Sequence, residues 1–128
     1  MDDTLEGVED RDLRRLVERI DEATETTLRL VFRYEGDERE VVHVREDIRE
    51  QFTDHELDER VKTLTMKGLG DPPTEQSLYD FGELNATLRF FEEVVVAVFP
   101  DGEWAGVVVV TDRQASPLVD TTLDFLGE

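Results

Sequence analysis

The sequence predicts an α+β fold in which helices pack on an antiparallel five-stranded sheet. Two observations carry this prediction: apolar residues recur at helical spacing near both ends of the chain, and two β-branched runs, Val94–Phe99 and Val107–Val110, are typical of central strands. The 128 residues are the usual length of one domain. We expect residues 1–9 to be a flexible acidic N-terminus and residues 10–128 to form the single α+β domain.

The first part of the chain predicts a helix and a β-hairpin. Apolar residues from Leu13 to Ala23 follow a helical period, which predicts a helix over residues 10–25. Thr27–Tyr34 then alternates as a strand, and Gly36-Asp37 forms the turn to a second strand, Glu40–Arg45. The alternation predicts one apolar strand face, made by Leu28, Leu30, Phe32 and Tyr34.

The middle of the chain is predicted to be helical. Asp47–Phe52 fits a short helical turn, and Thr53 with Glu56 has the spacing of a capping box that begins a longer helix. Gly68–Pro73, rich in glycine and proline, ends that helix. A second short helix is expected over Thr74–Phe81.

The last part predicts a three-stranded meander and a helix. Leu84–Phe90 alternates as a strand, although a helix over residues 81–91 also fits the pattern; we expect the strand. Val94–Phe99 and Trp104–Thr111 are the next strands. Ser116 as N-cap before proline begins the final helix, and Gly127 stands at its C-cap. The predicted order is αββα(α)βββα.

The charge indicates adaptation to concentrated salt. Asp and Glu number 33 against 14 Lys and Arg, which gives a formal net charge of −19. Only Lys62 and Lys67 are lysines. In concentrated KCl the screening length falls to about 3 Å, so this self-repulsion would not unfold the protein. An acidic disordered chain is excluded by the apolar runs, and an acidic mimic of nucleic acid is a minor alternative.

Several classes of function find no support in the sequence. There is no cysteine, which excludes disulfides and thiolate chemistry. His43 and His55 are the two histidines and match no metal-ligand motif, and Ser77 and Ser116 stand in no nucleophile motif. We therefore expect no enzyme activity, no metal and no cofactor. No basic recognition helix, signal peptide or membrane span is visible, so we expect a cytoplasmic protein that binds neither nucleic acid nor membrane.

The placement of the cations suggests a binding face. If the predicted strand phases hold, one sheet face carries several of the few positive charges, because five residues would point the same way. These residues are Arg29, Arg33, His43, Arg45 and Arg89. Guanidinium groups grip carboxylates and phosphates bidentately, so the face is a candidate site for an anionic ligand or an acidic partner. The alternative is that the arginines pair with the protein's own acids across strands.

The order of elements resembles that of the roadblock/LC7 family. The resemblance lies in the helix, hairpin, helix, meander and final helix, and in the stretch Val107–Asp112 leading into Ser116–Leu126. The resemblance implies a roadblock-like or profilin-like sandwich of sheet and helices that serves as a non-enzymatic, dimerising platform. Gly68–Pro73 and the added helix depart from the family pattern and leave the sheet register and the dimer surface open.

Other segments resemble small uncharacterised acidic proteins of haloarchaea, from which no activity carries over. They are Tyr34–Asp37, Val42–Asp47, Ser77–Leu84 and Thr87–Glu92. The lysine-poor, acidic composition resembles that of haloarchaeal proteins as well.

From these observations we expect a protein-interaction or regulatory module. Both faces of Val94–Phe99 and Val107–Val110 are apolar and need a cover: the terminal helices can cover one face, and the middle helices or a partner subunit the other. We expect a homodimer and a further, unidentified protein partner. The alternative is a small-molecule sensor domain of the GAF/PAS type that binds an anionic ligand on or under the sheet. An apolar cavity with convergent polar groups would favour the sensor, and a flat apolar surface would favour the interaction module.

Overall fold

The computed structural model describes residues 14–19, 22, 27–69, 81–102 and 104–127. Its strands are β1 (Leu28–Glu35), β2 (Glu38–Val44), β3 (Thr87–Phe90), β4 (Val94–Pro100) and β5 (Ala105–Asp112). Its helices are α3 (Glu46–Gln51), α4 (Asp54–Leu69) and α5 (Pro117–Leu126), together with a helical segment at residues 14–19. The predicted α+β fold with a five-stranded antiparallel sheet is confirmed.

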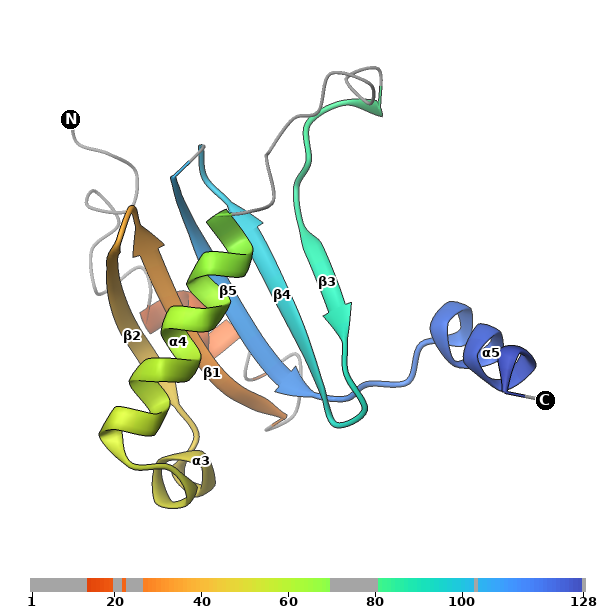
Figure 1. Ribbon diagram of the computed structural model, residues 1–128, viewed down its shortest axis with the longest axis horizontal. Helices are drawn as coiled ribbons and strands as arrows, with labels where there is room; N and C mark the ends of the chain where they lie inside the picture. Colours follow the sequence, from red (N-terminus) through yellow and green to blue (C-terminus); the bar gives the residue numbers. More distant parts are fainter. Residues whose placement is uncertain (1–13, 20–21, 23–26, 70–80, 103, 128) are drawn as a thin grey trace.

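The sheet joins a hairpin to a meander. Its strand order is β2-β1-β5-β4-β3, and every neighbouring pair is antiparallel (Figure 1). The hairpin turns at Gly36, whose φ of 61° lies in the left-handed region that glycine adopts without strain. β5 is the central strand, because it pairs with β1 on one side and with β4 on the other.

α4 covers one face of the sheet, which we call the inner face. Its Val61 is 1% exposed and packs against side chains from the three central strands. These side chains are Leu30, Phe32 and Tyr34 of β1, Val96 and Val98 of β4, and Val108 and Val110 of β5. Most of the core therefore lies between α4 and the sheet.

A second cluster lies on the opposite face, which we call the outer face. Val17 of the N-terminal helical segment packs there against Leu28, Val31 and Val109. Both faces of β1 and β5 are thus covered, as the continuous apolar runs require.

A bulge in β1 changes the predicted strand face. The pairing of β1 with β5 shifts register between Leu28 and Leu30, so an extra residue, Arg29, is inserted at that point. Leu28 consequently packs with the outer cluster, whereas Leu30 packs with the inner one. The prediction that Leu28 shares a face with Leu30, Phe32 and Tyr34 is wrong for this reason.

The predicted helix starts are largely confirmed. At α4, the backbone N–H of Glu56 donates to Oγ1 of Thr53 at 3.1 Å, and the N–H of Thr53 donates to Oε1 of Glu56 at 2.8 Å. At α5, Ser116 is the N-cap and a proline follows it, but its hydroxyl makes no capping hydrogen bond within the described chain. The Asp120 carboxylate instead accepts the N–H of Ser116 at 2.9 Å.

Some predicted segments differ from the structure or lie outside the described residues. The strand predicted over Leu84–Phe90 is confined to Thr87–Phe90. Of the helix predicted over residues 10–25, positions 14–19 and 22 are described, and they are helical. The predicted flexible N-terminus, residues 1–9, and residues 74–80 of the predicted second short helix lie outside the described part.

α5 stands apart from the sheet. Figure 1 shows it projecting beyond the end of β5 and the turn between β3 and β4. None of the residues Pro117–Leu126 is buried. The final helix is therefore present as predicted, but it does not cover either sheet face.

Candidate functional site

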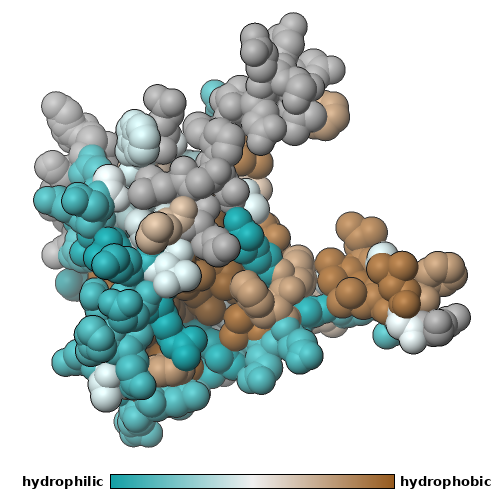
Figure 2. Space-filling model, in the orientation of Figure 1, coloured by the Kyte–Doolittle hydropathy of each residue, from teal (hydrophilic) through white to brown (hydrophobic). Residues whose placement is uncertain are grey.

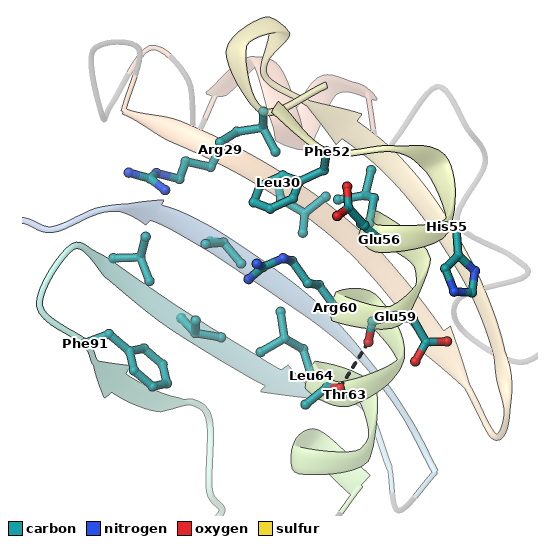
Figure 3. A pocket seen from close by; sticks show the side chains of 15 residues that line it. Arg29, Leu30, Phe52, His55, Glu56, Glu59, Arg60, Thr63, Leu64 and Phe91 are labelled. Atoms are coloured by element: carbon teal, nitrogen blue, oxygen red, sulfur yellow. Dashed lines mark hydrogen bonds between the residues drawn. The ribbon is translucent and has the colours of Figure 1, made fainter. Parts of the chain in front are cut away.

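A hollow of about 610 Å³ opens on the inner face beside α4. Its floor is made by sheet side chains, Leu30, Val94, Val96 and Val110, and Leu57 and Leu64 of α4 form one wall. Ile48 of α3 and Phe52 also line it, and Phe91, which is 51% exposed, stands at its far lip (Figure 3). A volume of roughly 300–1,000 Å³ with an apolar lining is typical of small-molecule sites.

Arg60 is the cation that reaches into this hollow from α4. Figure 3 shows its guanidinium extended over the strands, and its Cζ lies 4.2 Å from the centroid of the Phe52 ring. This stacking on an aromatic face is a cation–π contact that holds the guanidinium in place. Among the residues that the structure describes, no carboxylate forms an ion pair with Arg60.

The other polar groups of the hollow lie at its rim. Glu56 accepts hydrogen bonds in the capping box, and the backbone N–H of Thr53 is the main cause that lowers the pKa of its carboxyl. Arg60 lowers that pKa further through its charge. His55 and Glu59 point outward from α4 in Figure 3. The hollow is therefore largely apolar, and its two arginines differ: Arg29 pairs with Asp112, whereas Arg60 makes no ion pair within the described residues.

A cluster of charges closes one end of the sheet. Nε of Arg29 lies 2.5 Å from Oδ1 of Asp112, and Nη1 of Arg45 lies 2.8 Å from Oδ2 of the same carboxylate. Nε of Arg45 also donates to Asp47 at 2.6 Å. The hydrogen bond from Arg45, followed by that from Arg29, lowers the pKa of Asp112. These two arginines are engaged by the protein's own acids, and they hold the ends of β1, β2 and β5 together.

The remaining residues of the predicted cationic face are divided between the two faces of the sheet. Arg33 and His43 lie on the outer face, where Nε of Arg33 donates to Glu40 at 2.7 Å. Arg89 lies on the inner face.

The prediction that Arg29, Arg33, His43, Arg45 and Arg89 share one sheet face is therefore wrong. The bulge turns Arg29 toward the inner hollow, and Arg45 lies beyond the end of its strand. The alternative, pairing with the protein's own acids, holds for Arg29, Arg33 and Arg45.

A second feature is the apolar surface of α5. Four of its large side chains are exposed: Leu118 at 80%, Leu123 at 54%, Phe125 at 71% and Leu126 at 70%. They gather on one side of the helix, while Asp120, Thr121 and Asp124 lie on the other. Figure 2 shows α5 as a largely apolar projection.

The outer face carries a smaller exposed apolar surface over β3 and β4. Leu88 is 53% exposed and Phe99 is 43% exposed. Both lie on the outer face, since Leu88 pairs with Ala97 and Phe99 with Val107.

Comparison with known families matches residues 14–127 to DUF7522, a domain of unknown function. The chain belongs to the DUF7522 family. The match covers every element described above, so the hollow, the charge cluster and α5 all lie within the DUF7522 domain. No curated protein and no solved structure matches the chain.

Within the described residues of the DUF7522 domain, no group of three or more acidic or histidine side chains is placed to hold a metal ion. No helix in the described part is long and apolar enough to cross a membrane. What the described residues offer chemically is a largely apolar hollow with the guanidinium of Arg60 outside an ion pair, and an amphipathic helix, α5, with no buried residue.

Neither feature of the DUF7522 domain was identified from the sequence, although a signal for Arg60 exists there. Leu57, Val61 and Leu64 mark the buried stripe of α4, and Arg60 stands one position before Val61 and four before Leu64. A cation beside an apolar helical stripe is placed to reach over the sheet. Nothing in the sequence indicates that α5 does not pack on the sheet, because the spacing of its apolar residues would fit a helix packed on its own sheet equally well.

Proposed function

We propose that this chain is a non-enzymatic protein-interaction module that forms a homodimer through α5. The observation that carries the proposal is an amphipathic helix with no buried residue, whose apolar side exposes Leu118, Leu123, Phe125 and Leu126. Exposed apolar surface of this kind marks an interaction site. The roadblock/LC7 resemblance supports the same class of function, since it implies a non-enzymatic, dimerising platform.

The length of α5 supports a partner. It has 10 residues, and isolated helices shorter than roughly 12–15 residues are marginal in water. Most helical stability in proteins comes from packing of an apolar side. A helix this short, with no residue buried, therefore requires a surface outside its own fold.

Contacts made by Arg113 hold the first turn of α5 next to the turn between β3 and β4. Nη1 of Arg113 donates to the carbonyl oxygen of Phe91 at 2.8 Å, and its Nη2 pairs with Asp120 in the first turn of α5. The same guanidinium lies 5.1 Å from the centroid of the Phe90 ring. Because Arg113 ties the helix to the β3–β4 turn, the apolar side of α5 is free for a second copy.

The surface that receives α5 in the proposed dimer is the outer face of the second copy, around Leu88 and Phe99. Each copy then supplies one helix and one sheet face, which is the reciprocal arrangement of a closed two-fold dimer. Apolar burial is the driving force, because copies that each carry −19 repel one another. We further propose that the protein works in concentrated KCl, which screens this repulsion.

Light scattering coupled to gel filtration in concentrated KCl tests the proposal. The wild-type chain is expected to show twice its mass of 14.8 kDa. Leu123→Asp places a charge on the apolar side of α5 and is expected to give the mass of one chain. Thr121→Asp places the same charge on the polar side of the same helix and is expected to leave the dimer intact. A wild-type chain with the mass of a monomer would overturn the proposal.

The hollow beside α4 favours a second candidate function, that of a small-molecule sensor domain. Its apolar lining and the guanidinium of Arg60 that converges on it are the features that distinguish such a site from a flat docking surface. The two functions are compatible, because the hollow lies on the inner face and the proposed dimer uses the outer face.

A further inference from the structure

We propose that the hollow beside α4 binds a small apolar molecule carrying one carboxylate, and that Arg60 is the residue that selects the negative charge. This inference rests on the second candidate function above and names its ligand class and its specificity residue. It is argued from the lining of the hollow, from the state of Arg60 and from the balance of charges around it.

The lining selects an apolar body. Leu30 is 5% exposed, Val96 is 3% exposed and Val110 is 8% exposed, so the floor consists of side chains that belong to the core. The walls come from α4 and from Phe52, and Phe91 forms a lip that a ligand would cover. A ligand that fills about 610 Å³ against this floor would remove its own apolar surface and that of Phe91 from water, which is favourable for a ligand of one or two rings or a medium-length acyl chain.

Arg60 selects the charge because its guanidinium is available. Arg29, the other arginine that lines the hollow, is held by Asp112 at 2.5 Å. Arg60 instead stacks on Phe52 at 4.2 Å, which leaves the edge of the guanidinium, with its N–H donors, open. The stacking fixes the plane of the group, so a carboxylate arriving at the edge can accept two parallel N–H bonds.

The nearby acids do not replace this carboxylate. Glu56 is the closest candidate, but its Oε1 accepts the N–H of Thr53 at 2.8 Å in the capping box. Glu59 points outward from α4 in Figure 3. The chain has 33 acidic residues, yet Arg60 reaches over an apolar floor and makes no ion pair within the described residues. An anion supplied from outside best explains this arrangement.

Two probes that differ only in charge test the inference. Naphthalene-2-carboxylate and naphthalene-2-carboxamide have the same ring system, and the amide lacks the negative charge. Methyl NMR shifts of Leu30, Leu64 and Val96 report entry into the hollow, and titration gives the two dissociation constants. For the wild-type chain we expect the carboxylate to bind about tenfold more tightly than the carboxamide, the size of one charge-assisted contact.

Variants of Arg60 separate the charge effect from folding. Arg60→Gln is expected to abolish the preference for the carboxylate while the carboxamide still binds, and Arg60→Lys is expected to retain part of it. Arg49→Gln removes an exposed arginine of α3 that does not line the hollow, and it is expected to leave the preference unchanged. Unchanged methyl spectra of the free variants show that each of them folds.

Three results would overturn the inference, and each has a different consequence for the proposed sensor function. Equal binding of both probes to the wild-type chain removes the charge selection but keeps a small-molecule site. Absence of methyl shifts with either probe at millimolar concentration removes the site and the sensor function together. Intermolecular contacts between α5 methyl groups and the hollow would show that a second copy occupies it instead.

Discussion

The guanidinium of Arg45, directly after β2, holds the carboxylate of Asp112 at the end of β5, with Nη1 and Oδ2 2.8 Å apart. Arg29 of β1 reaches the same carboxylate from the other side. The hairpin of β1 and β2 is thereby joined to β5, which is distant in sequence, by a single acidic side chain at one end of the sheet. Asp112 is only partly exposed, at 34% of its side chain, so water weakens these contacts without removing them.

Replacing Asp112 by asparagine is expected to lower the free energy of unfolding by about 1 to 2 kcal/mol, because two guanidiniums lose a charged partner at a partly exposed site. Chemical denaturation followed by circular dichroism measures the change. Asp58→Asn removes an equal charge from an exposed position of α4 and is expected to stay within about 0.5 kcal/mol of wild type. Equal stability of the two variants would show that the cluster does not stabilise the sheet.

The same carboxylate predicts a dependence of stability on pH. Arg45, more than Arg29, lowers the pKa of Asp112 below its ordinary value of 3.8. A group whose pKa is lowered on folding stabilises the native state above its unfolded pKa, and this contribution is lost as the pH falls through the folded pKa. As the pH is lowered below the ordinary pKa, the free energy of unfolding is therefore expected to fall less steeply in Asp112→Asn than in wild type. Parallel acid profiles for the two chains would contradict this assignment.

The capping box at the start of α4 provides a third prediction. Thr53→Ala removes the hydroxyl that accepts the N–H of Glu56 and is expected to cost about 1 kcal/mol of stability. Thr63→Ala is the matched control, because Thr63 is an exposed residue inside the same helix, where alanine is favoured. Thermal unfolding should therefore shift downward for the first variant alone. A loss of similar size in Thr63→Ala would indicate a general sensitivity of α4 rather than the cap.

Gly106 in β5 is expected to tolerate no side chain. A Cβ at this position would lie 2.6 Å from Oη of Tyr34 and 2.8 Å from the carbonyl oxygen of Phe99. Tyr34 is 2% exposed and has no room to move, so Gly106→Ala should lower the free energy of unfolding by about 2 kcal/mol or more. In Gly127→Ala the new Cβ comes no closer than 3.4 Å to its neighbours, and denaturation should show little change. A stable Gly106→Ala chain would show that Tyr34 can leave its place.

Salt should control the proposed dimer. Raising KCl from about 0.2 to 2 M shortens the screening length severalfold, so the dissociation constant of the dimer should fall by about tenfold or more. Sedimentation velocity over a KCl series measures it directly. Tighter association at low salt would instead indicate that ion pairs, rather than the apolar side of α5, hold the copies together.

Much of the fold could be predicted from the sequence because its strands and helices differ clearly in apolar period. Val94–Phe99 is apolar throughout and mostly β-branched, as a central strand is, and Thr53 with Glu56 is a local signal that needs no tertiary information. The bulge at Arg29 could not be predicted in this way. Both faces of β1 are buried, so Leu28 can be buried on either face, and the hydrophobic pattern does not determine which face it occupies.

The candidate site was harder to predict, since it depends on how elements pack. The predicted cationic face relied on strand phases that the bulge changed, and on treating Arg45 as part of its strand. Arg60 and Phe52 meet only because α3 and α4 join at a particular angle, which no local pattern encodes. The final helix was predicted from Ser116 and its proline, but where a helix packs is decided by surfaces elsewhere.

The pairing of β1 with β5 also has a consequence for the order of folding. The hairpin of β1 and β2 and the meander of β3, β4 and β5 each consist of neighbouring segments, and each can form early. Phe32 meets Val108 only after a long stretch of chain has closed into a loop, and the core buries its largest apolar residues only at that step. We therefore expect a slow, cooperative search in milliseconds to seconds, in which the central seam closes last.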